Sequence, residues 1–322
     1  MGADLLSSRA IIGSFYEQLE GLRSTGWVDQ IGMRFSSDQS SETYNWLGMT
    51  PTMREWIGER QAKGFSSNGI EITNRQFEAT IDFKLQELRR DKTGQVMVRI
   101  GDLAARAQTH WASLLTTLIE NGESTTCYDG QFFFDTDHPN AIGAGGSSTF
   151  SNDLGTGVFD VASATAPTAA ELVNCITTMI TQMFTFKDEQ GEPVNEDASS
   201  FLVMVPTPFW PAAMQAVRAN TLSDAVASNA VAADNKLKFT GLNIEVRANP
   251  RLTWTDKLAV FRTDGRTKPF ILQQETGTDV VLKVIGAGSE LEMNEDKHRY
   301  GIDTWRNVGY GMWHHAVLAT LT

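Results

Sequence analysis

The chain has 322 residues, of which 41% are hydrophobic and 20% are charged, a composition typical of a folded protein with room for about two compact units. Its formal net charge of −12 argues against non-specific binding to nucleic acid, because phosphate contacts need cationic side chains. Two cysteines are too few for a disulfide scaffold, which indicates synthesis in a reducing compartment, and the sequence shows neither a signal peptide nor an apolar run near the roughly 20 residues of a membrane span.

Residues 1–30 are predicted to form an arm with one short helix inside 5–22. The apolar side of that helix consists of Ile11, Ile12, Phe15 and Leu19. Because so few apolar residues cannot enclose a core, we expect the arm to lie on another part of the protein or of the assembly.

Residues 31–91 are predicted to form an extended, two-stranded projection. Residues 77–83 alternate apolar and polar side chains, the period of a half-exposed strand, and 66–69 supply a turn. A lone hairpin is only marginally stable in water. We therefore expect the projection to contact the core of its own chain sparsely and other subunits heavily.

Four side chains of the projection are predicted to contact neighbouring subunits. They are Trp46, Arg54, Trp56 and Arg60. A hairpin without a core has no interior for two indoles, and aromatic and arginine side chains are the usual anchors of protein interfaces. The alternative is that both tryptophans pack against the long helix that follows in the same chain.

The clearest periodicity in the sequence predicts a helix within residues 94–121, with about 25 helical residues and a length of roughly 37 Å. Asn121-Gly122 is typical of a helix C-terminus. Only one stripe of this helix is apolar, so one face should be buried along its length. The stripe consists of Ile100, Leu103, Ala104, Ala107, Trp111, Leu114, Leu115 and Leu118.

A second unit is predicted from residue 168 onward, after a Gly/Ser/Thr/Ala-rich linker at 140–167. Thr168 and Glu171 form a capping box that begins a helix, residues 201–205 form a buried strand, and Thr207-Pro208 begin another helix. Helix, strand and helix in this order indicate an α/β layer. Strands dominate the remaining sequence from 238 onward.

One short segment holds most of the candidate chemistry. It contains Cys127, Asp129, Asp135, Asp137 and His138. The paired cysteines or histidines of an intracellular zinc site are missing, whereas Asp-Gly and His-Pro are ordinary turn dipeptides. We therefore predict a structural turn without metal. A metal site, or a Cys127 nucleophile with His138 or His110 as its base, is the alternative.

Adjacent His314 and His315 are predicted to lie on a strand, where neighbouring side chains point to opposite faces. We expect one ring to be buried and the other exposed, so the two could not bind one ion together. The nucleophile elbow, the Walker loop and the zinc-protease helix motif are missing from the sequence.

Several ordered motifs resemble the major head subunit of Mu-like tailed phages and prophages. The first stretch is carried by Tyr44, Trp46, Leu47, Gly48, Pro51, Thr52, Glu55, Trp56 and Gly58. Further matches are Phe77-Glu78 with Thr80, most of 127–139, Tyr300-Gly301-Ile302-Asp303 and Gly309-Tyr310-Gly311-Met312-Trp313. Together they sample residues 44–315 in family order, except for about 140–290.

The resemblance implies an α+β protein with the Hong Kong 97-type phage capsid fold. That fold has an N-terminal arm, an extended hairpin loop, a peripheral domain with a long spine helix, and an axial α/β domain. On this chain we expect the arm at 1–30, the extended loop at 31–91, the peripheral domain at 92–165 and 249–322, and the axial domain at 166–248.

The function implied is that of a major capsid protein, not an enzyme, with no cofactor, no metal and no membrane contact. Copies would assemble through hexamers and pentamers into an icosahedral shell that encloses DNA without binding it specifically. Scaffold, portal and decoration proteins are candidate partners, and the chain would be made in the cytoplasm of a bacterial host before joining the virion. The alternatives are a cytosolic metal-dependent enzyme using Cys127, Asp129 and His138, and a tail or portal-vertex protein.

Overall fold

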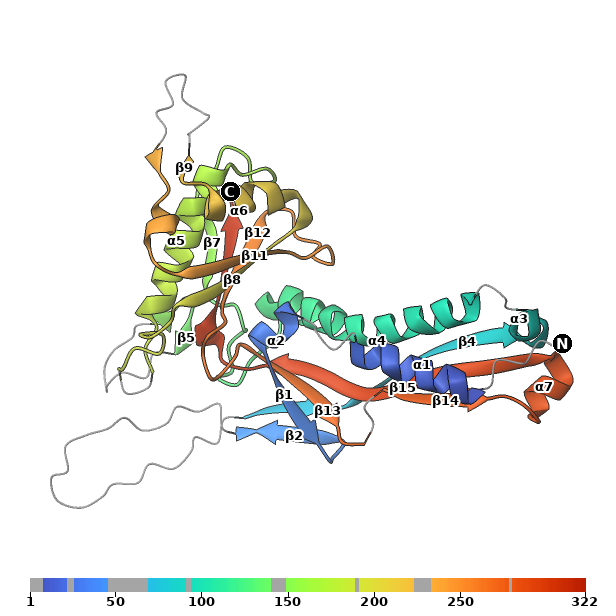
Figure 1. The fold of residues 1–322 in the computed structure, drawn as a ribbon. Helices are drawn as coiled ribbons and strands as arrows, with labels where there is room; N and C mark the ends of the chain where they lie inside the picture. The colour runs from blue at the N-terminus through green and yellow to red at the C-terminus, as the bar shows by residue number, and fades with distance from the viewer. Residues whose placement is uncertain are drawn as a thin grey trace, which may run out of the picture.

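The structure, a computed structural model, describes residues 8–21, 26–45, 69–90, 94–139, 149–188, 191–222, 233–277 and 280–322. Figure 1 shows an elongated half built along one long helix and a wider α/β half that carries the C-terminus. The four candidate contact residues Trp46, Arg54, Trp56 and Arg60 lie outside the described residues.

A five-stranded sheet supports the elongated half, and its longest strand is β15. On one side β15 pairs antiparallel with β4. On the other side it pairs antiparallel with β14 along residues 299–303 and with β13 along residues 306–310, and β1 pairs in parallel with β13. These strands are β1 (Gly32–Ser37), β4 (Arg75–Lys84), β13 (Phe270–Glu275), β14 (Val281–Ile285) and β15 (Lys297–Tyr310). Alternate residues of β15 are buried, so one face of the sheet is covered.

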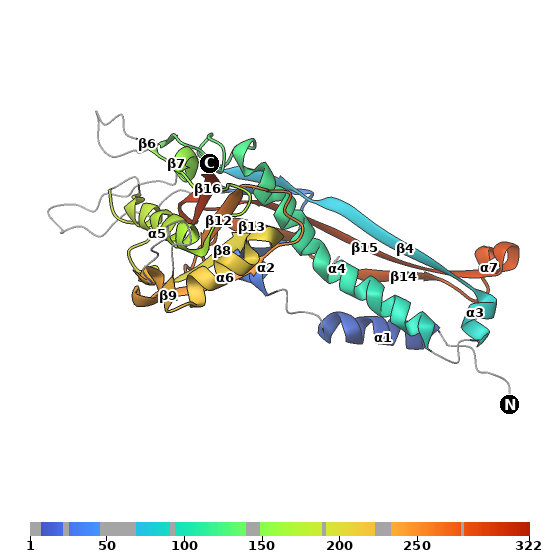
Figure 2. The same cartoon turned by 90° about the horizontal axis from the view of Figure 1, so that it is seen from above.

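Helix α4 (Gln95–Glu120) confirms the predicted long helix and buries most of its apolar stripe, with Leu114 and Leu118 half-buried. Helix α1 (Ser8–Gly21) lies along α4, and its Ile11 and Phe15 are fully buried in the same cluster. The helical part of the arm therefore packs on its own chain. Its apolar side joins α4 and the elongated sheet in one core cluster, and Figure 2 shows α1 beside α4.

The described part of the projection differs from the expectation of sparse contact. Both β1 and β4 are strands of the elongated sheet. On the apolar face of β4, Phe83 is buried and Ala79 and Ile81 are half-buried in the cluster that includes α4. The pair β2 (Ser41–Tyr44) and β3 (Ile70–Thr73) also packs on this sheet. The Tyr44 hydroxyl donates to Oε1 of Gln273 at 2.7 Å, and a Cβ on Gly309 would lie 2.2 Å from the side chain of Ile72.

The α/β half holds a second five-stranded sheet in the order β11-β8-β12-β16-β7. Its strands are β7 (Asp153–Phe159), β8 (Ser200–Val205), β11 (Asn243–Ala248), β12 (Lys257–Arg262) and β16 (Ala316–Leu321). Helices α5 (Ala169–Thr185) and α6 (Trp210–Arg218) lie side by side against it. The capping box of Thr168 and Glu171 begins α5 as predicted.

Three strands of this sheet come from segments that the sequence analysis assigned to the peripheral domain. These are β7, β12 and β16. Every residue of β16 is buried, which is consistent with its place inside the α/β sheet, between β12 and β7. The remaining elements are α2 (Trp27–Ile31), α3 (Leu85–Arg90), η2 (Asn121–Glu123), β5 (His138–Pro139), β6 (Thr149–Phe150), η3 (Thr207–Phe209), β9 (Thr221–Leu222), β10 (Ala233–Asp234), η4 (Lys236–Phe239), α7 (Glu290–Glu295) and η5 (Trp313–His315).

None of the described helices combines the length and the apolar character that a membrane crossing requires. The largest core cluster joins the two halves, because Trp111, Leu115 and Ile119 of α4 pack together with the strands of the α/β sheet.

Leu115→Ala is expected to lower the free energy of unfolding by about 2–5 kcal/mol, because it opens a cavity where α4 meets both halves. Val98→Ala on the same helix is the matched control, since Val98 is 64% exposed and its loss should cost less than about 0.5 kcal/mol. Chemical denaturation of the two variants measures the difference, and equal costs would show that the C-terminal end of α4 does not carry the core.

Candidate functional site

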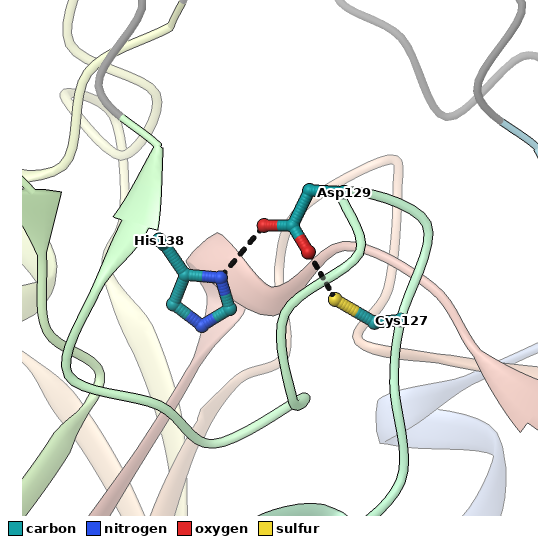
Figure 3. A group of neighbouring side chains, drawn as sticks. All are labelled: Cys127, Asp129 and His138. Atoms are coloured by element: carbon teal, nitrogen blue, oxygen red, sulfur yellow. Dashed lines mark hydrogen bonds and ion pairs between the residues drawn. The ribbon is translucent and has the colours of Figure 1, made fainter.

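The loop between α4 and β5 brings three side chains of the candidate cluster together (Figure 3). Asp129 lies between the other two, with its Oδ1 2.8 Å from Sγ of Cys127 and its Oδ2 2.7 Å from Nδ1 of His138. Cys127 and His138 are buried, and Asp129 is largely so. Sequence proximity therefore does correspond to spatial contact for these three residues.

A tight turn produces this arrangement. The amide of Cys127 donates to the carbonyl of Gln131 at 2.7 Å, and the amide of Gly130 donates back to the carbonyl of Cys127 at 3.2 Å. Gly130 has φ 89°, in the left-handed region that favours glycine. The Asp-Gly dipeptide thus forms the turn that the sequence predicted.

The aromatic residues after the turn hold the loop in the core. Phe133 and Phe134 are buried, and Phe133 stacks on Tyr310 with ring centroids 4.7 Å apart. Phe132 is 41% exposed and lies outside this core.

The electrostatics of the cluster keep the thiol neutral and the carboxylate charged. Burial, reinforced by the negative charge of Asp129, raises the pKa of the Cys127 thiol far above its usual range. Burial also raises the pKa of Asp129, but the hydrogen bonds from His138 and Cys127 outweigh it, so the net pKa is lowered. A protonated thiol donates to an ionised carboxylate, and the thiol is a poor nucleophile.

The order of the three groups also opposes thiol catalysis. A nucleophilic cysteine needs a base in hydrogen-bond contact with its sulfur and a third group behind that base. Here the carboxylate separates the sulfur from the imidazole. His110 does not replace it: this ring packs edge-on against Phe77, and burial lowers its pKa to about 4.

The same three side chains form the one group of potential metal ligands among the described residues, with donor atoms within 4.8 Å of one another. Zinc would need a thiolate and a fourth donor. The group supplies three donors, and both carboxylate oxygens already accept hydrogen bonds. Asp135 and Asp137 lie outside this group: Asp135 accepts from the amides of Phe132 and Thr136, and Asp137 is exposed beside it.

Two residues that sequence reasoning missed complete the site. Nε2 of His138 lies 3.1 Å from Oδ1 of Asn152, whose amide nitrogen donates to the carbonyl of Phe133 at 2.8 Å. The ring of His138 stacks on Trp313 with centroids 3.9 Å apart. Asn152 carried no sequence signal, whereas Trp313 stood in the last of the resemblance motifs.

Trp313 lies in η5, the short turn where the chain leaves β15 for β16. The cluster therefore attaches the loop after α4 to the point at which the chain crosses from one sheet to the other. The role that this arrangement supports is structural. Each of the three polar side chains is hydrogen-bonded to another, and the stacked rings exclude water.

The expectation that one of His314 and His315 is exposed was wrong. Both are buried, at 5% and 3% exposure, because they lie in the 3₁₀ turn η5 and not on a strand. Burial lowers the pKa of His314 well below its usual range and that of His315 to about 3, so both rings are neutral at pH 7. Nδ1 of His315 lies 2.8 Å from Oδ1 of Asn195.

With this geometry established, known proteins give the context. Residues 9–166 match the model of a family described as Mu-like prophage major head subunit gpT. That match covers just under half of the chain. The major capsid protein of Escherichia phage Mu is 33% identical over 151 residues, which make up 45% of this chain and 50% of that protein. The FluMu major head subunit of Haemophilus influenzae is 32% identical over 146 residues, 45% of this chain and 47% of that one.

The chain thus spans about half the length of the curated relatives that it matches. Among solved structures, a chain in the procapsid of bacteriophage JBD30 has a TM-score of 0.54 at 23% identity, covering 98% of this chain and 75% of that chain. A chain in the capsid of cyanophage P-SCSP1u has a TM-score of 0.54 at 12% identity, covering 93% and 89%. These likenesses show the fold: it is the α+β, Hong Kong 97-type fold of phage capsid subunits.

Asp129→Asn is expected to destabilise the protein at pH 7 by about 1–3 kcal/mol, because it weakens hydrogen bonds to a buried charge. The pKa of Asp129 is lowered in the folded state, so its contribution is present above the unfolded pKa of about 4 and is lost as pH falls through the folded value. The gap in melting temperature to wild type should therefore narrow in acid. Asp137→Asn, at the exposed neighbour, should show little change, and a gap independent of pH would contradict the assigned charge.

The Cys127 thiol is expected to resist iodoacetamide at pH 8 in the folded protein and to react after unfolding, because burial and Asp129 keep it protonated. Elemental analysis should find far less than one zinc per chain. Rapid alkylation of the native protein, or stoichiometric zinc removed only by chelators, would instead favour the thiol or metal alternative.

Proposed function

We propose that this chain is the major capsid subunit of a tailed bacteriophage or prophage, and that its copies assemble through hexamers and pentamers into an icosahedral shell around the genome. The observation that carries the proposal is the match in fold to a procapsid subunit over 98% of the chain, together with the family match over residues 9–166.

The geometry supports assembly in three ways. A 26-residue helix that packs on a sheet through a continuous hydrophobic core stiffens the elongated half. This half can therefore make contacts far from the α/β half. The two halves share one core cluster, so a load on the elongated half is transmitted to the α/β half. Head-to-tail contacts between such asymmetric subunits close into rings.

The remaining partners follow from the same proposal. A shell protein with net charge −12 would confine DNA without gripping it, because it offers few cations to displace phosphate counterions. Scaffold, portal and decoration proteins are the further candidate partners. The chain would be made in the cytoplasm of a bacterial host and end in the virion capsid.

The proposal assigns no catalysis, cofactor or metal to the chain. The names of the matched relatives are those of head and capsid subunits. The Cys127–Asp129–His138 cluster then has a structural task, which is to fix the loop after α4 against Trp313. Trp46, Arg54, Trp56 and Arg60 are proposed as contacts to neighbouring subunits, on the grounds given by the sequence.

Electron microscopy of the purified chain, with elemental analysis of the same sample, tests the proposal. Rings or shells of five- and six-fold symmetry without stoichiometric metal are expected. A monodisperse small particle at high concentration would count against a capsid subunit, and metal in such a particle would support the enzyme alternative. Particles with a single rotational axis would instead support a tail or portal-vertex protein.

Trp56→Ala is expected to leave the melting temperature of the unassembled chain unchanged and to reduce the yield of particles. Removing an anchoring indole from a desolvated interface costs about 2–4 kcal/mol, and the cost recurs at every copy in a shell. Leu115→Ala is the contrasting variant, because its loss should appear in melting of the monomer. Normal assembly of Trp56→Ala at wild-type concentration would exclude Trp56 as an anchor.

A further inference from the structure

The outer edge of the α/β sheet at β11 is left open by the described residues. Strand β11 pairs with β8 on one side, and no described strand pairs with its other side. Helix α6 lies over this edge and encloses with β11 a groove of about 600 Å³. The groove is lined by Trp210, Met214, Val217, Arg218 and residues 243–248.

The groove has an apolar floor and a basic rim. Trp210, Met214 and Val217 recur at helical spacing along one side of α6, and Trp210 is 47% exposed. Ile244 and Val246 of β11 are only half-buried opposite them. The apolar floor, together with an exposed indole, is typical of a protein-binding surface.

Arg218 and Arg247 stand exposed on the rim. The one acidic side chain among the lining residues, Glu245, accepts a hydrogen bond from Nε2 of Gln30 in α2 at 2.9 Å. With two arginines against one glutamate the lining carries a net charge of +1, in a chain that has 39 acidic and 27 basic residues. A ligand for this groove should be apolar at its tip and acidic beside it.

The opposite edge of the same sheet carries such a feature. Strand β7 pairs with β16 at Leu154 and Phe159, and between those positions residues 155–158 leave the ladder as a bulge. Val158 on the bulge is 52% exposed, and Gly157 has φ 90°. The exposed carboxylate of Asp160 follows directly.

We propose that the β7 bulge of one copy, with Val158 at its tip and Asp160 beside it, docks into the α6–β11 groove of a second copy. The groove and the bulge lie on opposite edges of one sheet, so the contact is head-to-tail and can close into a ring. Val158 meets the apolar floor, and Asp160 meets Arg247 or Arg218. This inference rests on the proposed function and names the surface through which rings would form.

A charge swap tests the contact. Arg247→Glu and Asp160→Lys are each expected to raise the subunit concentration needed for assembly about tenfold, because like charges then face one another, with no change in monomer melting. The double variant should return to within about twofold of wild type. Arg266→Glu is the matched control, since Arg266 is exposed in the same half but does not line the groove, and it should assemble normally.

Disulfide trapping gives an independent readout. Oxidation of assembled Val158→Cys/Met214→Cys chains should yield covalent multimers, whereas Val98→Cys/Met214→Cys should not, although Val98 is 64% exposed. Wild-type chain that forms no rings or shells would overturn the proposed function and this contact together. Wild-type assembly with no rescue in the charge-swap double variant, or with no cross-linked multimers, would overturn the contact alone.

Discussion

The structure depends on how the chain crosses between its two sheets, most directly where β15 of the elongated sheet becomes β16 of the α/β sheet through the turn at Trp313. The chain also passes between the two halves from α4 to β7 and from β12 to β13, so this turn acts together with those connections and the shared core cluster to fix the orientation of the sheets. The turn is held by ring stacking, with His138 on one side of the indole and His314 against it at 3.6 Å between centroids. Stacked, buried rings keep a defined relative position, because their contact area is large and few rotamers are open to them.

The polar cluster behind this stack fixes one geometry. A buried polar group without a hydrogen-bond partner destabilises the fold by more free energy than a satisfied group contributes. The network of Cys127, Asp129, His138 and Asn152 therefore tolerates few alternative arrangements. Apolar packing alone would tolerate several. The network therefore favours one angle between the loop after α4 and the turn at Trp313. The lowered pKa of Asp129 and the raised pKa of Cys127 are its electrostatic consequence.

The sequence predicted those elements whose signals are local. The stripe of α4 and the capping box of Thr168 need only three- and four-residue spacing, and the structure contains both. The turn at Gly130 was also local. The partners of His138 were not: Asn152 and Trp313 come from 14 and 175 positions further along the chain, and no periodicity joins them to it. The His314–His315 prediction failed for a related reason, because a strand pattern hides a single 3₁₀ turn.

The projection illustrates how tertiary pairing overrides a local argument. The alternation in β4 was consistent with an exposed hairpin or with the edge of a larger sheet, and local sequence could not choose between them. The choice was made by β15, more than two hundred positions away, whose own alternation offered a matching apolar face. The same reasoning explains why the open edges matter. The described strands leave the outer side of β11 and the β7 bulge uncovered, and an unpaired strand edge is where another chain can associate.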